Sequence, residues 1–201
     1  MNIGVNQFCF PMSYDVADAV KAAKRLGFDS IEVCFTAADG ARPGGGVTDA
    51  LDISGYHNRL LNMGSTDKDV RELKKLADDT GIRISSVGGI VSFSIYPLTA
   101  TDAQVAQKSM DAVKKMLDFA RILGADTILV IPGMLTADME YKAAYDLAQS
   151  RVAQLAAYAP DIQLAIENVW NGMLYSPLEM IRFVDETGRS NVGVYFDIAN
   201  A

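Results

Sequence analysis

The sequence contains little histidine and little cysteine. Its 201 residues include one histidine and two cysteines. A barrel nuclease that holds several zinc ions needs many histidine ligands, so one histidine argues against that class. Both cysteines, Cys9 and Cys34, fall inside strand-like runs rather than in loops, and we expect them to be buried free thiols. Thiols of this kind favour a reducing, cytoplasmic location.

Positive charge and long apolar runs are scarce as well. The net charge is -7, and acidic and basic residues are mixed along the chain, so we expect no basic patch for nucleic acid. No apolar run reaches the ~18 residues of a membrane helix. The first residues, Met-Asn-Ile-Gly-Val-Asn, lack the basic and apolar segments of a signal peptide. The sequence therefore predicts no nucleic-acid partner, no membrane span and no signal peptide.

Strand-like and helix-like segments alternate along the chain. Because 50% of the residues are apolar and 21% are charged, we expect one globular domain over residues 1–201. The apolar pattern predicts strands at 2–10, 30–36, 83–91, 127–133, 164–169 and 192–198. It predicts helices at 15–26, 67–80, 102–123, 138–158 and 177–187.

Capping residues mark the ends of these helices. Ser176 with Pro177 and Glu179, and Thr101 with Gln104, have the spacing of capping boxes. Glycines end four of the five predicted helices, and a strand follows each within about four residues. These glycines are Gly27, Gly81, Gly124 and Gly188. The repeated unit is a short link from a helix to a parallel strand.

Alternating helices and apolar strands predict an α/β fold with a parallel sheet. A doubly wound sheet usually has a glycine-rich loop after an early strand, but residues 8–12, Phe-Cys-Phe-Pro-Met, contain no glycine. We therefore expect a (β/α)8 TIM barrel. Six units in about 200 residues leave roughly 34 residues each, and eight units need roughly 270. We expect the first six strands and five helices only, with strands seven and eight missing, so that the isolated fragment is poorly soluble, oligomeric or inactive.

Residues 37–65 form a long segment without a predicted element. It contains three consecutive glycines, Gly44 to Gly46, and the only histidine, His57. A loop of this length is usually functional or mobile. The glycines are not followed by a lysine and a helix start, so we favour a lid over a phosphate loop. His57 is either an exposed loop residue or a substrate contact.

Two carboxylates lie near the ends of apolar strands. Glu167 lies in the run 163–170 and Asp197 lies in the run 192–200. An ionised carboxylate in such a strand costs several kcal/mol unless it is compensated. Two carboxylates at matching places in successive strands indicate a shared cation. A salt bridge or a cap at the mouth of the sheet is the alternative for each.

The last two predicted strands carry a resemblance to a known family. The segments Ala165–Asn171, Ser176–Met180 and Val192–Asn200 resemble the xylose isomerase-like TIM-barrel family of sugar and sugar-phosphate isomerases and epimerases. That family takes glutamate, aspartate, histidine and glutamate metal ligands from the ends of strands five to eight. The resemblance implies that Glu167 and Asp197 are the first two of these ligands. It implies that Glu167 is also a catalytic acid or base.

The resemblance also implies a reaction and a cofactor. The expected reaction is isomerisation or epimerisation of a small sugar or sugar phosphate by proton transfer through an enediolate. A site rich in oxygen ligands favours Mn²⁺ or Mg²⁺, while Co²⁺ or Zn²⁺ is tolerated. A non-catalytic sugar-binding module or an inactive barrel fragment is the alternative. Homo-oligomers are compatible with either interpretation.

Five residues are candidates for contacts with the sugar. Asn200 takes a place where members of the family carry a polar substrate-binding side chain. Glu32 lies in an apolar strand and either binds a sugar hydroxyl or pairs with a neighbouring cation. Phe8 and Trp170 lie at strand ends and either stack on the sugar or pack in the core. His57 completes the set.

Overall fold

The computed structural model describes residues 2–36, 58–89 and 95–200. These ranges contain six strands: β1 (Gly4–Asn6), β2 (Ser30–Phe35), β3 (Arg83–Gly89), β4 (Thr127–Val130), β5 (Gln163–Glu167) and β6 (Val192–Tyr195). They contain five α-helices: α1 (Val16–Arg25), α3 (Asp67–Thr80), α4 (Ala103–Leu123), α5 (Tyr141–Tyr158) and α6 (Pro177–Glu186). Among these helices, none has the length and hydropathy that a bilayer span requires.

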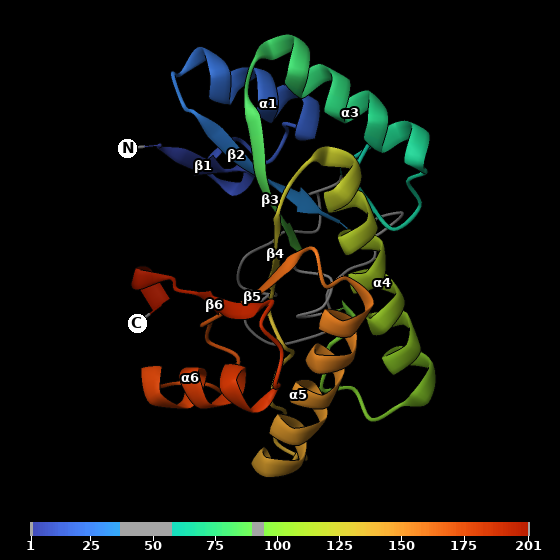
Figure 1. The fold of residues 1–201 in the computed structure, drawn as a ribbon, viewed down its shortest axis with the longest axis vertical. Helices are drawn as coiled ribbons and strands as arrows, with labels where there is room; N and C mark the ends of the chain where they lie inside the picture. Colours follow the sequence, from blue (N-terminus) through green and yellow to red (C-terminus); the bar gives the residue numbers. More distant parts are fainter. Residues whose placement is uncertain (1, 37–57, 90–94, 201) are drawn as a thin grey trace.

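The six strands form one parallel sheet in sequence order. Its strand order is β1-β2-β3-β4-β5-β6, and every neighbouring pair is parallel. A doubly wound sheet reverses its order and carries helices on both faces, whereas this order is that of a barrel. In Figure 1, α3, α4 and α5 lie on the right of the sheet and both chain ends lie on the left. The predicted α/β architecture is confirmed.

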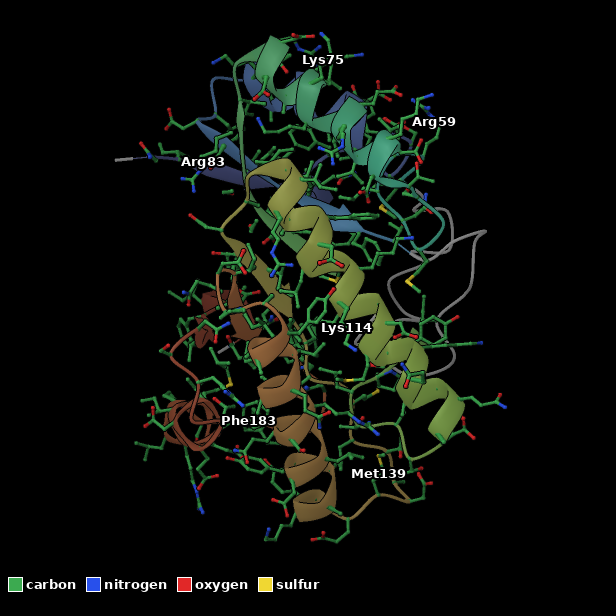
Figure 2. All side chains as sticks on the ribbon, turned by 45° about the vertical axis from the view of Figure 1, so that its right-hand side comes forward. Arg59, Lys75, Arg83, Lys114, Met139 and Phe183 are labelled. Carbon is green, nitrogen blue, oxygen red and sulfur yellow. The ribbon has the colours of Figure 1, made fainter. Side chains whose placement is uncertain are left out.

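The helices bury one apolar face each against the sheet and against one another. Along α3, Val70, Leu73 and Ala77 are buried at the spacing of one helix face. Phe183 of α6 is fully buried and meets Tyr145 of α5 edge to face, with ring centroids 5.1 Å apart. Figure 2 shows Phe183 where α6 adjoins α5. Full burial of such a side chain contributes about 1.5–3 kcal/mol.

The helix caps agree with the sequence at most ends. Ser176 caps α6 and accepts a hydrogen bond from the backbone N–H of Glu179 at 3.2 Å. The predicted capping box at Thr101 is wrong, because the carboxylate of Asp102 caps α4 by accepting from two backbone N–H groups. An aspartate offers a charged acceptor at a helix N-terminus, which favours it over the preceding threonine. All four glycines predicted to end helices have positive φ.

The first strand is shorter than its apolar run. β1 ends at Asn6, because the side chain of Asn6 accepts a hydrogen bond from the N–H of Phe8 and so starts a 3-10 turn, Gln7–Cys9. The expectation that both cysteines are buried is therefore half wrong. Cys9 lies in this turn and is exposed, whereas Cys34, inside β2, is buried.

The β6 side of the sheet leaves apolar side chains exposed. Val194, Phe196 and Ile198 have 41%, 56% and 84% of their surface exposed. Leu178 and Ile181 of α6 are also exposed, and Ile181 lines a groove of about 400 Å³ together with Val194 and Phe196. Exposed contiguous apolar surface of this kind promotes association.

Candidate functional site

The carboxyl ends of the strands surround a cavity of about 630 Å³. Because all strands are parallel, these ends meet at one rim, where active sites of barrel proteins lie. Polar side chains from five strands line the cavity. They include Asn6 of β1, Glu32 of β2, Ser85 of β3, Glu167 of β5, and Tyr195 and Asp197 at the end of β6. The structure thus brings the three predicted site carboxylates, Glu32, Glu167 and Asp197, into one cavity.

Glu32 is a buried carboxylate held by side-chain donors. Only 4% of its surface is exposed. Asn6 donates to Oε1 at 2.5 Å and Ser86 donates to Oε2 at 2.7 Å. The strand register places Asn6 and Ser86 directly opposite Glu32 on its two neighbouring strands. Hydrogen bonds from both sides offset much of the cost of burying this charge.

The surroundings of Glu167 differ from those of Glu32. It is the last residue of β5 and is half-buried. Within the described residues, no hydrogen-bond donor reaches its carboxylate. Desolvation raises the pKa of Glu167 to about 7, and the charges of Glu32 and Asp197 add to that shift. A carboxyl group with a pKa near neutrality can both accept and return a proton under physiological conditions.

Asp197 is held by a short chain of amide contacts. The side chain of Asn168, which follows β5, donates to the carbonyl of Asp197 and accepts from its N–H, both at 2.8 Å. This pair continues the β5–β6 contact past the last residue of each strand. Asn200 donates to Asp197 Oδ2 at 2.8 Å, and the N–H of Ala199 donates to Oδ1 at 2.7 Å. Asn200, predicted to contact the substrate, therefore orients Asp197.

Tyr195 is a cavity residue that the sequence analysis missed. It lies opposite Glu167 in the β5–β6 register. Burial raises the pKa of its phenol well above the ordinary range, and the charge of Glu32 together with a hydrogen bond to that carboxylate adds to the shift. Strand alternation is the signal that could have found it, because Tyr195 is two residues before Asp197 and so faces the same side.

The other three predicted site residues, Phe8, Trp170 and His57, do not all lie in the cavity. Phe8 lines the cavity from the 3-10 turn after β1. Trp170 has 64% of its surface exposed and is not part of the cavity wall. His57 lies outside the described residues, as does most of the predicted lid.

The cavity wall fits part of a hard cation site. Glu167 and Asp197 offer carboxylate oxygens, the ligands that Mg²⁺ and Mn²⁺ prefer. A cation beside Glu167 would favour its charged form, which desolvation and the charges of Glu32 and Asp197 disfavour. Across the described ranges, no three side chains of His, Cys, Asp or Glu lie close enough to hold a metal. Glu167 and Asp197 are the two carboxylates of the described part that fit such a site.

Comparison with known proteins identifies related structures. The sequence profile of the "Xylose isomerase-like TIM barrel" family matches residues 20–201. Comparison with curated proteins gives no match. A D-psicose 3-epimerase solved in the presence of D-fructose is 22% identical, with a TM-score of 0.73 over 98% of this chain and 63% of its own.

Two further structures show the same fold. D-psicose 3-epimerase from Clostridium cellulolyticum H10, solved with D-tagatose, is 18% identical with a TM-score of 0.72, covering 98% of this chain and 63% of its own. A xylose isomerase-like barrel from Mycobacterium smegmatis, in complex with magnesium, is 18% identical with a TM-score of 0.65. The match covers 99% of this chain and 65% of that one. The chain thus spans about 63% of the length of the D-psicose 3-epimerases it matches.

Proposed function

Because the chain belongs to the xylose isomerase-like TIM barrel family, we propose that its strand-end cavity is the site of a metal-dependent sugar isomerase or epimerase. One observation carries the proposal. Glu167 and Asp197 share one cavity at the carboxyl ends of neighbouring strands, and Glu167 has a pKa of about 7. The sugar epimerases among the similar structures support the choice of substrate class.

Glu167 is the group that moves a proton. The reaction removes a proton from the carbon beside a carbonyl to give an enediolate. Isomerisation then adds a proton to the neighbouring carbon, whereas epimerisation adds one to the opposite face of the same carbon, which needs a second acid besides Glu167. A base works best when its pKa lies near the working pH. In the metal-free protein desolvation raises the pKa of Glu167 to about 7, and a bound cation would lower it again. Its carboxylate has no competing hydrogen-bond donor within the described residues, so it is available to the substrate.

A divalent cation is the cofactor that suits these residues. Glu167 and Asp197 would hold it, with water, substrate oxygens or side chains from further strands of a completed barrel as the other ligands. When bound, a cation of this type supplies electrostatic stabilisation of the negative charge that develops on the substrate oxygen. Asn168 and Asn200 fix Asp197, so that its carboxylate keeps one orientation.

The cavity favours an uncharged sugar over a sugar phosphate. Three carboxylates, those of Glu32, Glu167 and Asp197, line it, and no lysine or arginine does so among the described residues. A phosphate group would meet repulsion here unless cations from elsewhere compensated it. Phe8 offers an aromatic face for the sugar ring. Contacts of Trp170 and His57 with the sugar remain predictions from the sequence alone.

The test is hydrogen exchange during turnover. The complete natural chain that contains these residues is incubated in D₂O with D-fructose, D-tagatose and other free ketoses, with Mn²⁺ or Mg²⁺, and NMR follows deuterium entry beside the carbonyl and the formation of new sugars. We expect deuterium incorporation with the wild type and none with Glu167→Gln. Glu72→Gln, which changes an exposed glutamate on α3, is the matched control and keeps the activity.

Two outcomes would contradict the proposal. Sugar binding without any exchange, with metal present, would favour the non-catalytic sugar-binding alternative. Neither binding nor exchange with any ketose of the panel would remove the sugar assignment altogether.

A further inference from the structure

The cavity wall beside β1 is formed by a short turn with one buried residue. Phe8 and Cys9 are exposed and line the cavity from the 3-10 turn that follows β1. Gln7, the first residue of this turn, has only 1% of its surface exposed. The position of the two wall residues therefore depends on what holds Gln7 inside the protein.

The side chains of Gln7 and Asn58 form a reciprocal amide pair. Gln7 Nε2 donates to Asn58 Oδ1 at 2.7 Å, and Asn58 Nδ2 donates to Gln7 Oε1 at 3.2 Å. Asn58 is completely buried. Each amide supplies both a donor and an acceptor to the other, so the pair offsets the cost of burying two polar side chains.

The amide pair also takes the place of a strand beside β2. Backbone pairing of β1 with β2 ends at Asn6 and Glu32. Two residues further along β2, the N–H of Cys34 donates to Gln7 Oε1 at 2.9 Å, and the carbonyl of Cys34 accepts from Asn58 Nδ2. These backbone groups need partners inside the protein, and the two side chains supply them. The chain can therefore leave the sheet after Asn6 and turn into the cavity wall.

Asn58 is fixed independently of the turn. Its backbone N–H donates to Thr36 Oγ1 at 3.2 Å, and its carbonyl accepts from Asn62 Nδ2 at 2.6 Å. Thr36 and Asn62 are buried as well. Asn58 is thus a stationary partner to which the side chain of Gln7 is bound.

We propose that Gln7 and Asn58 are positioning residues, whose amide pair holds the ring of Phe8 against the sugar. Phe8 contacts the ligand, whereas Gln7 and Asn58 act only through it. This inference rests on the proposed function, since it assumes that the cavity binds a sugar. It adds two residues, 51 positions apart in the sequence, that determine where the aromatic part of the wall lies.

The test is a double-mutant cycle in the complete natural chain. Isothermal titration calorimetry with Mn²⁺ present measures the affinity for D-fructose and D-tagatose of the wild type, Phe8→Ala, Asn58→Ala and the double variant. Phe8→Ala should lower the affinity about 3- to 10-fold through loss of the aromatic contact. Asn58→Ala should cause a similar loss, but a change of less than about 2-fold when Phe8 is already alanine.

Two results of the cycle would overturn the inference. Full affinity in Asn58→Ala would show that the pair does not position the wall. Equal losses from Asn58→Ala with and without Phe8 would show that Asn58 acts by another route.

Asn191→Ala is the matched control. Asn191 is also a buried asparagine, and its Nδ2 donates to three backbone carbonyls, those of Ala156, Ala159 and Ile162. It lies just before β6, at the end of the sheet opposite the cavity. Asn191→Ala should lower stability and keep the affinity of the wild type. A purely structural role of Asn58 would give the same pattern, and that result would refute the inference.

A second measurement uses the wild type and so does not depend on the folding of a variant. Iodoacetamide labels exposed thiols, and mass spectrometry of peptides separates Cys9, in the same turn as Phe8, from the buried Cys34. At ten times its dissociation constant, D-fructose should slow labelling of Cys9 about 10-fold, because only about a tenth of the sites stay free. Cys34 is the internal control and should stay unlabelled with and without the sugar.

The outcomes separate the inference from the proposed function. Sugar binding that leaves the labelling of Cys9 unchanged would place the turn outside the sugar contact and would overturn the inference alone. If the wild type binds neither D-fructose nor D-tagatose nor any other ketose of the panel, the proposed function fails and the inference fails with it.

Discussion

Glu32 and Glu167 are two glutamates on the wall of one cavity, and their surroundings are opposite. Glu32 is buried and receives hydrogen bonds from Asn6 and Ser86. Glu167 is less buried, yet desolvation raises its pKa to about 7, and no donor within the described residues contacts it. The comparison shows that burial alone does not decide whether a carboxylate is left without hydrogen bonds. The availability of donors decides it, and donors stabilise the charged form.

The two walls of the cavity differ in how they hold their carboxylates. On the β1–β3 side, cross-strand neighbours satisfy Glu32 and so make it a fixed anchor. On the β5–β6 side, the amide groups of Asn168 and Asn200 orient Asp197 but leave Glu167 unsatisfied. An unsatisfied carboxylate costs stability in the empty protein. That cost can be recovered when a proton, a cation or a substrate binds.

The largest effect is expected from Glu167→Gln. Removing a general acid or base of this kind should lower turnover about 100- to 10,000-fold. The deuterium-exchange assay measures it, with Mn²⁺ or Mg²⁺ at saturation. Under the proposed roles, Glu32→Gln should lower turnover less than Glu167→Gln does. Equal losses in both variants would show that the two glutamates share one function, and the comparison between them would fail.

Glu32→Gln should instead show its effect in stability. The amide nitrogen cannot accept a hydrogen bond, so one of the two donors, Asn6 or Ser86, loses its acceptor. We expect a loss of about 1–3 kcal/mol in the free energy of unfolding, measured by urea denaturation. Glu72→Gln, on the exposed face of α3, should change it by less than about 0.5 kcal/mol. A neutral result for Glu32→Gln would mean that its hydrogen bonds add nothing to stability.

The sequence predicts the sheet and the helices well, and it predicts the strand ends less well. Alternation of apolar strands and capped helices depends on local patterns, which the chain displays directly. Several predicted strands run past the last paired residue. Ile131, for example, is buried although β4 ends at Val130, because residues after a strand also pack in the core. At positions such as Ile131, an apolar residue indicates that the side chain is buried. It does not indicate that the backbone pairs with a neighbouring strand.

The site residues also differ in how well the sequence predicts them. Glu167 and Asp197 are visible in the sequence because a charge in an apolar strand is unusual, and the structure places both in the cavity. Tyr195 is signalled only by its alternation with Asp197, and by itself an aromatic residue in a strand is ordinarily core. Its place beside Glu32 in the cavity wall depends on the curvature that brings β6 near β2, and a local pattern does not encode curvature. The sequence likewise does not reveal that Asn168 orients Asp197, because this role depends on which strand lies beside β5.

The pH dependence of stability should separate Glu167 from the other carboxylates. Its pKa is about 7 in the folded chain against an ordinary value of 4.5, so the folded state holds this proton more tightly. Stability from this group is therefore complete below about pH 4.5 and is lost as the pH rises through about 7. Glu167→Gln should be the more stable protein at pH 8 by about 1–2 kcal/mol, after allowance for partial exposure.

Denaturation of metal-free wild type and Glu167→Gln, with a chelator present, measures this difference at pH 5 and at pH 8. Only the change in the difference between the two pH values reports on Glu167, since the other groups titrate in both proteins. Parallel stability curves would show that Glu167 has an ordinary pKa, and its contrast with Glu32 would disappear.

The smallest expected effect is stabilisation by a divalent cation. At ten times its dissociation constant, Mg²⁺ or Mn²⁺ should stabilise the wild type by about 1.4 kcal/mol, because it binds only the folded chain. Asp197→Asn and Glu167→Gln should lose this shift, since each removes a proposed ligand. Glu32→Gln should keep it, because the donors around Glu32 leave its charge compensated without a cation.

Thermal melts with and without the cation at pH 8 measure these shifts, and Asp185→Asn, an exposed aspartate on α6, is the matched control that keeps the shift. A cation effect that survives in Asp197→Asn and Glu167→Gln but is lost in Glu32→Gln would place the ion on the opposite wall of the cavity. In that case Glu32 would be the ligand, and the hydrogen bonds from Asn6 and Ser86 would be second contacts of a metal ligand. The contrast between the two glutamates would then be reversed, with Glu167 acting on the proton alone.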